Sequence, residues 1–503
     1  MKQRAIFPAL QLSEGALNEQ VYKAIHNAIL TGQLPAGTKI PSSRHLSEMM
    51  MVSRNTIIQG IDRLIDEGYL ETRQGSGTYV TQNIPDHLLL EIQNKPPKLD
   101  QISPPKLNRT IAALQPRWQQ YQKKAKPASI FKVGVGCTDL FPHTIWSRLL
   151  GRISRHSHKA IANYNDVMGY RPLREAIAKY LTTTRGVQTD ADSIMIVNGT
   201  QQAINLTIQV LLNAGEEVIL DDPGYDGALG AFLTREINVH RLQSDEEGMD
   251  IPFAEKHFPN TRLIYSTPSH QFPLGDTLSL SRRLQLLEWA NAGDRWIFED
   301  DYNGEFRYRS RAIQALQGLD HHHRVLYSGT FSKMFYPGFR LGYIALPPSL
   351  IEPFKIAKYY ADACNSFLEQ AVLASFITEG EYAKHVRRIR KACLERKNAL
   401  RASVEMHFQE SLTIPSTDSG IHSIAWLHHS EDLPLLMEAA SQLQLGIQSL
   451  DRYRHQTSSQ KALLFGFAAH PPDQIEQHIQ QFSNRFYALK NAESQRKAKG
   501  KTS

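Results

Sequence analysis

The sequence predicts a multidomain protein: a small helical unit ending in a β-hairpin, then an α/β domain with a mostly parallel sheet, and a smaller C-terminal α+β lobe. Three observations lead to this prediction. The chain has 503 residues, too many for one hydrophobic core. Apolar residues near the start recur at helical spacing. Beyond about residue 130, short apolar runs alternate with amphipathic helical segments, a pattern typical of parallel α/β sheets.

Composition and charge narrow the class of protein. The formal net charge is +7, which makes an acidic partner such as DNA plausible. The three cysteines are widely spaced in the sequence and form neither a disulfide framework nor a zinc-binding spacing, as expected in a reducing cytosol. We see no secretory signal at the start and no apolar run long enough to cross a bilayer. We therefore expect a cytoplasmic protein.

Residues 14–82 form the predicted helical unit. A first amphipathic helix carries Leu17, Val21, Ile25 and Ile29 on one face. Glycines and prolines between residues 32 and 41 break the chain, and a short helix follows from about Ser43. Ser53 is placed to cap a third helix that ends at Gly68. Two short strands around the turn 74–77 complete the unit as a wing.

Residues 83–128 are rich in proline and lysine, a composition that favours an extended linker, with one predicted helix around residues 109–122. The excess positive charge is concentrated in this linker and in a basic tail, residues 491–503. Those charges either attract phosphates or only keep these segments solvated, and the sequence leaves both readings open.

The body of the chain, residues 129–490, divides into a large lobe (about 160–370) and a small lobe (about 371–490). Its predicted strands cover residues 193–197, 217–220, 263–266, 295–298 and 324–327, with helices over 201–212 and 281–292.

The segment from Ser328 to Tyr343 is the most informative one. Lys333 follows a hydroxyl-rich run that includes Thr330 and Ser332, and Arg340 comes seven residues later. A lysine amine can form a Schiff base with a carbonyl cofactor, while hydroxyls and a guanidinium can hold its phosphate. The alternative is an ordinary lysine in a surface loop.

Other polar groups follow predicted strands, where ligands bind in open α/β sheets. Gly199, Thr200 and Gln201 open a helix, whose N-terminus can hold a phosphate. Tyr225 could stack on a flat heterocycle. Three adjacent carboxylates, residues 299–301, require a positive partner nearby. A protonated pyridine nitrogen would be such a partner for Asp300, and the Tyr302 hydroxyl could reach the ring hydroxyl.

Together these segments resemble the type I pyridoxal-phosphate fold of aminotransferases. The resemblance implies the cofactor pyridoxal 5′-phosphate, with Lys333 as the Schiff-base lysine and Asp300 at the pyridine nitrogen. It implies further that Tyr302 meets the ring hydroxyl, that Tyr225 stacks on the ring, and that the phosphate is held by Thr200, Thr330 and Arg340. Residues 164–174 resemble the family's segment beside the dimer-related site.

Two departures from that family concern the substrate. Phe272 stands where the family often has an asparagine that touches the cofactor hydroxyl. The run 460–467 lacks the arginine that clamps the substrate α-carboxylate, and Lys461 would be a poorer substitute. Arg452 or Arg454 could take that role. Full transamination of α-amino acids is therefore in doubt.

The N-terminal unit resembles the winged helix-turn-helix of GntR-type repressors, through residues 41–44, 52–57 and 75–78. A recognition helix needs polar residues at its N-terminus and an apolar stripe behind them, as the third predicted helix has. The predicted DNA-binding residues are Ser43, Arg44, Ser53, Arg54, Asn55, Thr56, Gly75, Ser76 and Gly77. The alternative is a helical accessory domain without DNA contact.

A GntR-type head joined to an aminotransferase-like body is the layout of the MocR/GabR regulators. The resemblance implies a DNA-binding transcriptional regulator that senses pyridoxal phosphate, or an amine or amino acid that reacts with it, and that forms a head-to-tail homodimer. Two alternatives remain: an aminotransferase whose head only localises it, and a repressor with a cofactor-free body. The run His321–His323 is predicted to be a solvated loop rather than a metal site.

Overall fold

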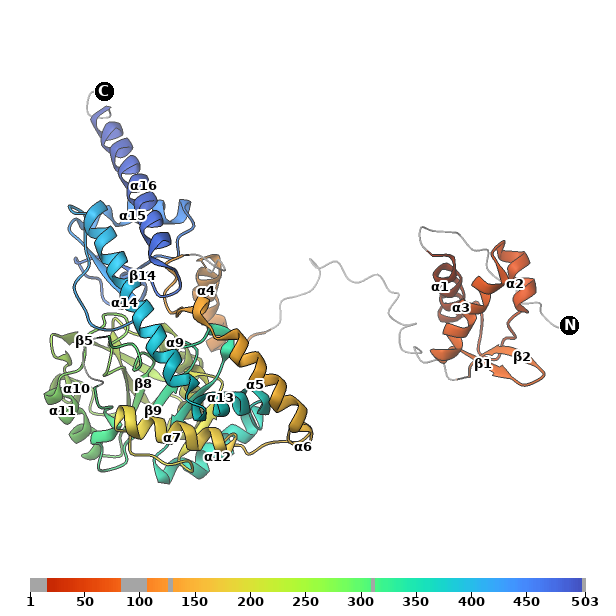
Figure 1. Ribbon diagram of the computed structural model, residues 1–503, viewed down its shortest axis with the longest axis horizontal. Helices are drawn as coiled ribbons and strands as arrows, with labels where there is room; N and C mark the ends of the chain where they lie inside the picture. Colours follow the sequence, from red (N-terminus) through yellow and green to blue (C-terminus); the bar gives the residue numbers. More distant parts are fainter. Residues whose placement is uncertain (1–15, 83–105, 125–129, 309–312, 500–503) are drawn as a thin grey trace. The chain divides into compact units, whose positions relative to one another are not determined.

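The computed structural model describes residues 16–82, 106–124, 130–308 and 313–499 (Figure 1). The chain divides into two compact units, residues 1–106 and 107–503, and each is described by itself. Most of the predicted linker and the last four residues of the predicted basic tail lie outside the described residues.

The N-terminal unit has the predicted elements in the predicted order: α1 (Leu17–Leu30), α2 (Ser43–Met50), α3 (Arg54–Asp66), β1 (Leu70–Arg73) and β2 (Gly77–Val80). The Ser53 side chain caps α3 by accepting a hydrogen bond from Thr56 N at 3.1 Å, as the sequence predicts. The two strands pair antiparallel to form the wing. The apolar stripes of the three helices meet in one core around Ile25, Ile57 and Leu64.

The second unit begins with α4 (Arg109–Lys124) and contains two lobes. Its large lobe contains α5 (His143–His156), α6 (His158–Ile161), α7 (Arg171–Arg185), β3 (Ile194–Val197), α8 (Thr200–Leu211), β4 (Glu217–Asp222), α9 (Asp226–Thr234), β5 (Asn238–Asp245), β6 (Gly248–Met249), α10 (Ile251–His257), β7 (Thr261–Ser266), α11 (Leu280–Asn291), β8 (Trp296–Asp301), β9 (Val325–Thr330), β10 (Gly342–Ala345), α12 (Ile351–Asp362) and α13 (Phe367–Thr378).

The large lobe is built on an eight-stranded sheet in the order β3-β10-β9-β8-β7-β4-β5-β6. Strands β5, β4, β7, β8 and β9 pair in parallel, whereas β10 runs antiparallel to both of its neighbours. The expectation of a mostly parallel sheet is therefore confirmed. The carboxyl ends of β3, β4, β7, β8 and β9 share one edge, and the loops leaving that edge carry the predicted cofactor residues.

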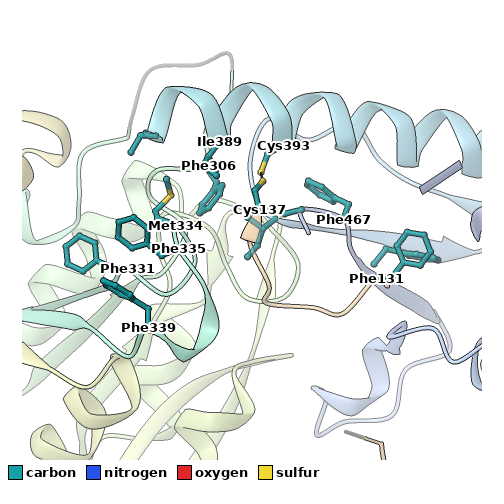
Figure 2. Close-up of a cluster of buried hydrophobic side chains, with 14 of the residues drawn as sticks. Phe131, Cys137, Phe306, Phe331, Met334, Phe335, Phe339, Ile389, Cys393 and Phe467 are labelled. Atoms are coloured by element: carbon teal, nitrogen blue, oxygen red, sulfur yellow. Dashed lines mark hydrogen bonds between the residues drawn. The ribbon is translucent and has the colours of Figure 1, made fainter. Parts of the chain in front are cut away.

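The small lobe has the four-stranded sheet β11-β12-β14-β13 and three helices: β11 (Leu412–Thr413), β12 (His422–Leu427), β13 (Gln448–Ser449), β14 (Ala462–Gly466), α14 (Glu381–His407), α15 (Leu433–Gln442) and α16 (Pro472–Lys499). The long helix α14 runs beside a buried apolar cluster that continues from one lobe into the other (Figure 2). Met334 and Phe335 belong to this cluster, so the chain on the C-terminal side of Lys333 is held in the core.

Two cysteines that are far apart in the sequence lie side by side in this cluster. The Sγ atoms of Cys137 and Cys393 are 3.2 Å apart, and both side chains are buried thiols (Figure 2). Sequence spacing gave no sign of this contact, because it depends on α14 returning over the segment around residue 137.

The predicted linker helix exists as α4, and it packs on α9. Arg109 Nε donates to Glu236 Oε1 at 2.9 Å, and a second, shorter contact joins Arg109 Nη2 to Glu236 Oε2. Thr110 Oγ1 lies 3.4 Å from the Thr234 carbonyl oxygen. The start of α4, the part of the predicted linker that the structure describes, therefore contacts the C-terminal end of α9.

Within the described ranges, every helix is too short or too polar to cross a membrane.

Candidate cofactor site and DNA-binding face

A cavity of about 330 Å³ opens at the carboxyl edge of the large sheet. Nine of the ten predicted cofactor residues line it: Thr200, Gln201, Tyr225, Asp300, Tyr302, Thr330, Ser332, Lys333 and Arg340. The tenth, Gly199, lies directly beside it, since a Cβ atom there would come within 3.0 Å of Arg340 Nη2. Residues from four separate segments, at the carboxyl ends of β3, β4, β8 and β9, therefore converge on a single site.

The three adjacent carboxylates at the end of β8 have three different environments. Glu299 is fully buried and accepts hydrogen bonds from the backbone N–H groups of Leu316 and Gln317 at 2.9 and 2.8 Å. Asp301 pairs with the buried Arg185 at 2.7 Å and accepts a hydrogen bond from the Tyr327 hydroxyl. Arg185, which the sequence did not suggest, is thus the positive partner of Asp301, and it leaves Asp300 for the cavity.

Asp300 is the carboxylate of this group that faces the cavity. Its Oδ2 accepts a 2.7 Å hydrogen bond from the Tyr265 hydroxyl, while its buried Oδ1 has no hydrogen-bond partner among the described residues. Burial raises the pKa of Asp300 to about 7, partly offset by the hydrogen bond from Tyr265. A cationic ring nitrogen next to Oδ1 would supply the missing partner and stabilise the ionised carboxylate.

Lys333 projects into the same cavity. Its Nζ donates to the Gly134 carbonyl oxygen at 2.9 Å. Burial lowers the pKa of the Lys333 amine, Asp300 opposes that change and Arg340 adds to it. A larger neutral fraction makes the amine a better nucleophile toward an aldehyde. The close fit of Gly136 against the Lys333 backbone, where a Cβ would lie 1.9 Å from the carbonyl oxygen, fixes the base of the side chain.

An anion-binding cup surrounds the start of α8. Gly199 precedes the helix with φ of 81°, a conformation that favours glycine. The first N–H groups of a helix have no acceptor within the helix and attract anions. Arg340 lies over this turn, and its Nη2 donates to the Asn198 carbonyl oxygen at 2.7 Å. The buried Ser332 Oγ, which has no partner among the described residues, adds a further donor to the cavity.

Aromatic rings form the walls of the cavity. Tyr225 immediately precedes α9, and its ring stacks at 6.5 Å from that of Tyr265. Phe272 also lines the cavity, with its ring 5.8 Å from that of Tyr302. The buried hydroxyl of Tyr302 has no partner among the described residues. Phe272 thus contributes an apolar ring to the cavity wall next to Tyr302.

The structure places no guanidinium other than that of Arg340 among the described residues lining the cavity. Lys461 pairs with Asp451 at 2.9 Å, and Arg454 Nη1 donates to the Gln460 carbonyl oxygen. The Arg452 guanidinium lies 5.8 Å from the ring centre of Tyr453. None of these three cations is part of the cavity lining, so neither suggested replacement for the carboxylate arginine is found there.

Five cavity residues were not expected from the sequence: Gly134, Tyr265, Thr267, Ile421 and His422. Ile421 and His422 come from the small lobe, so both lobes contribute to the site. Burial lowers the pKa of His422 to about 4, and its Nε2 lies 2.8 Å from the Pro273 carbonyl oxygen. This neutral imidazole borders the space beside Lys333.

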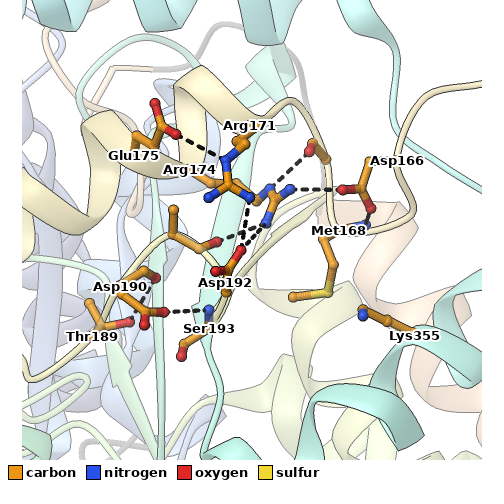
Figure 3. A network of polar contacts seen from close by, with 12 residues as sticks. Asp166, Met168, Arg171, Arg174, Glu175, Thr189, Asp190, Asp192, Ser193 and Lys355 are labelled. Carbon is orange, nitrogen blue, oxygen red and sulfur yellow. Dashed lines mark hydrogen bonds and ion pairs between the residues drawn. The ribbon is translucent and has the colours of Figure 1, made fainter.

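The segment predicted to lie near a dimer-related site is held by a buried arginine (Figure 3). Arg174 donates to Asp166 Oδ2 at 2.8 Å, to the Gly169 carbonyl oxygen at 2.9 Å and to the Ala191 carbonyl oxygen at 2.8 Å. The loop is therefore well fixed, yet Tyr164 on it is 90% exposed.

In the N-terminal unit, Arg54 and Asn55 lie exposed at the first turn of α3, while the hydroxyls of Ser53 and Thr56 hydrogen-bond to each other at 2.8 Å. Arg54 Nε donates to Ser43 Oγ at 3.1 Å, so α2 and α3 meet at this point. Arg44 is exposed nearby.

The wing turn contains Gly75 and Gly77, both with positive φ, and Ser76, whose hydroxyl meets that of Tyr79 at 2.7 Å. Two cations that we did not predict, Lys39 and Arg73, lie against the Tyr79 ring. Arg73 directly precedes the wing turn, which could have suggested it as a phosphate contact, whereas Lys39 reaches the wing only through its backbone bridge to Tyr79.

His321, His322 and His323 are exposed in the turn before β9. The part of the chain that the structure describes contains no group of three or more histidine, cysteine or carboxylate residues arranged to hold a metal ion.

Two family models match the chain: "Bacterial regulatory proteins, gntR family" over residues 17–80, and "Aminotransferase class I and II" over residues 136–480. The "Probable rhizopine catabolism regulatory protein MocR" of Rhizobium meliloti is 34% identical and covers 95% of each chain. The "HTH-type pyridoxine biosynthesis transcriptional regulator PdxR" of Corynebacterium glutamicum is 26% identical over 93% of this chain and 94% of its own.

Among solved structures, a kynurenine aminotransferase of Pyrococcus horikoshii superposes with a TM-score of 0.68 at 26% identity, over 76% of this chain and 97% of its own. The protein is therefore a helix-turn-helix regulator with an aminotransferase-like domain. It belongs to the MocR-type transcriptional regulators, and the cofactor that its second domain implies is pyridoxal 5′-phosphate.

Proposed function

We propose that this regulator binds pyridoxal phosphate in the cavity and changes its affinity for operator DNA in response to the cofactor, or to an amine or amino acid that reacts with it. The observation that carries the proposal is the convergence of Lys333, Asp300 and Arg340 on one cavity in a chain that also carries a gntR-type head. The name of the Corynebacterium relative, a pyridoxine biosynthesis transcriptional regulator, supports a link to this vitamer.

The residues present fit the cofactor. Three buried polar atoms without partners among the described residues, Asp300 Oδ1, Tyr302 OH and Ser332 Oγ, belong to side chains that line the cavity. Asp300 would hold the ring nitrogen, Tyr302 the ring hydroxyl and Tyr225 the ring face. Gly199, Thr200, Gln201, Thr330, Ser332 and Arg340 would hold the phosphate, and Lys333 would bond to the aldehyde carbon. When bound, the cofactor supplies an aldehyde that condenses with amines and a ring that withdraws electrons.

We favour sensing over catalytic turnover because the cavity lacks a described second arginine for a substrate carboxylate. An effector changes DNA binding only if it binds two states of the protein unequally. The described linker helix α4 contacts α9, and α9 begins immediately after Tyr225. Through this helix, a change at the ring face of the cavity would reach the linker that leads to the head.

We propose further that the protein acts in the cytoplasm as a head-to-tail homodimer, which would present two heads to paired half-sites. The exposed aromatic rings of Tyr164 and Tyr360 support such a contact surface.

The test is a footprint and binding titration on the DNA upstream of the protein's own coding region, with pyridoxal phosphate and candidate amines as ligands. A change in operator affinity on adding the cofactor, alone or with an amine, is expected. Protection that is identical at every ligand concentration would contradict the sensing role, and conversion of an amino acid to its keto acid would instead support an enzyme.

A further inference from the structure

The residue just before the phosphate cup, Asn198, has all of its polar groups engaged. Its N–H donates to Gln202 Oε1 at 2.7 Å, and its side-chain oxygen accepts from Asn365 Nδ2 at 2.6 Å. Its Nδ2 donates to Asp362 Oδ2 at 3.1 Å, and its carbonyl oxygen accepts from Arg340. The Arg340 guanidinium is thus hydrogen-bonded to the backbone carbonyl of Asn198, and the side chain of Asn198 is in turn fixed by Asp362 and Asn365.

Asp362 is the charged centre of this network. It lies at the C-terminal end of α12, and its Oδ2 also accepts from Gln202 Nε2 at 2.7 Å. Its Oδ1 pairs with Lys358, a fully buried lysine on the same helix. The Asp362 carboxylate thus holds the buried Lys358 and accepts from the two amides of Asn198 and Gln202 at the same time.

We propose that Asp362 is a positioning residue for the phosphate site, an inference that rests on the proposed binding of pyridoxal phosphate. Asp362 does not line the cavity. It fixes Asn198 and Gln202, and through the Asn198 carbonyl it orients Arg340 over the first turn of α8. An arginine fork binds a phosphate well only when its plane is held in the correct orientation.

If Asp362 positions the phosphate site, its loss should affect only ligands that carry the phosphate, whereas a general loss of stability would affect all ligands of the cavity. Asp362→Asn should weaken binding of pyridoxal phosphate on the order of fivefold, the value of about one oriented hydrogen bond, and leave binding of pyridoxal, which lacks the phosphate, unchanged. The ratio of the two dissociation constants, measured by fluorescence titration of the full-length protein, is therefore the readout. Asp192→Asn, an exposed carboxylate paired with Arg171 at 3.0 Å, is the matched control and should leave the ratio unchanged.

Asp362→Asn also removes the charge that compensates Lys358, so a second variant separates the two effects. Asn198→Ser breaks the link to Asp362 but keeps the Lys358–Asp362 ion pair, and it should likewise raise the dissociation constant for pyridoxal phosphate relative to that for pyridoxal. The double variant should be no worse than Asp362→Asn alone, because both substitutions break the same connection between Asp362 and Asn198. An equal loss for both ligands in Asn198→Ser, or no loss in either variant, would overturn the proposal. If the wild-type protein bound neither ligand, the proposed cofactor binding itself would fail.

Discussion

The Tyr265 hydroxyl donates a 2.7 Å hydrogen bond to Asp300 Oδ2, whereas Oδ1 of the same buried carboxylate has no partner among the described residues. The carboxylate is therefore oriented but only half satisfied. Such a group destabilises the cofactor-free protein and favours a cationic ligand, a common property of binding sites.

Asp300→Asn should stabilise the cofactor-free protein at pH 8. Burial raises the pKa of Asp300 from 3.8 to about 7. Above pH 7 the buried carboxylate is charged in the folded protein, and this charge lowers the free energy of unfolding. The penalty decreases as the pH falls from 7 and is absent below 3.8, where the carboxyl is protonated in both the folded and the unfolded protein. We expect a gain of about 1–3 kcal/mol at pH 8 from the removal of that charge.

Thermal unfolding of the cofactor-free variant and wild type at several pH values measures this effect. The gain in stability should shrink between pH 8 and pH 5. The Asp300→Asn variant should also bind pyridoxal phosphate more weakly than the wild type. A stability difference that is independent of pH would show that the Asp300 charge is not the cause.

Much of this site could be predicted because its motifs are local. Lys333 and Arg340 lie seven residues apart in the segment that joins β9 to β10, and Gly199 and Thr200 open a helix directly after a strand. Each signal is contained in a short window of the sequence. The Ser53 cap was predictable for the same reason.

The partners of these groups could not be predicted, because they depend on tertiary structure. Arg185 reaches Asp301 from a helix 116 residues earlier, and Ile421 and His422 enter the cavity from the other lobe. Strand β5 was missed because its sequence, Asn238–Asp245, is largely polar and lacks the apolar run of the other strands; it lies between β4 and the two-residue edge strand β6.

Lys333→Ala should abolish covalent attachment of the cofactor. Treatment with borohydride followed by peptide mass analysis should label the wild-type peptide that contains Lys333 and leave the variant unlabelled. Lys384→Ala, an exposed lysine paired with Glu381 outside the cavity, is the control and should be labelled as the wild type is. A labelled Lys333→Ala protein would show that another lysine carries the cofactor.

Arg54→Ala should weaken specific operator binding by about 1–3 kcal/mol, because Arg54 is exposed at the start of the predicted recognition helix. Arg44→Ala should instead weaken binding to all sequences and reduce the salt dependence, as a phosphate contact does. Fluorescence anisotropy with operator and scrambled duplexes at two salt concentrations distinguishes these effects. An equal loss on both duplexes for Arg54→Ala would assign it to the phosphate backbone.

The contact between Arg109 and Glu236 offers a test of how the body communicates with the head. Both side chains are at the surface, so losing the pair should scarcely change stability or cofactor affinity. Arg109→Ala should reduce the cofactor-induced change in operator affinity about two- to fivefold, since the linker helix would then be held to α9 by fewer contacts.

The measurement is operator affinity with and without pyridoxal phosphate. The charge-reversed double variant Arg109→Glu/Glu236→Arg should restore the response, because it restores the pair, whereas Lys384→Ala should respond as the wild type does. If pyridoxal phosphate changed the operator affinity of Arg109→Ala as much as that of the wild type, the sensing role would stand. The signal would then have to reach the head by a route other than the contact between α4 and α9. This outcome separates the path of the signal from its existence, because only the contact between α4 and α9 has been changed.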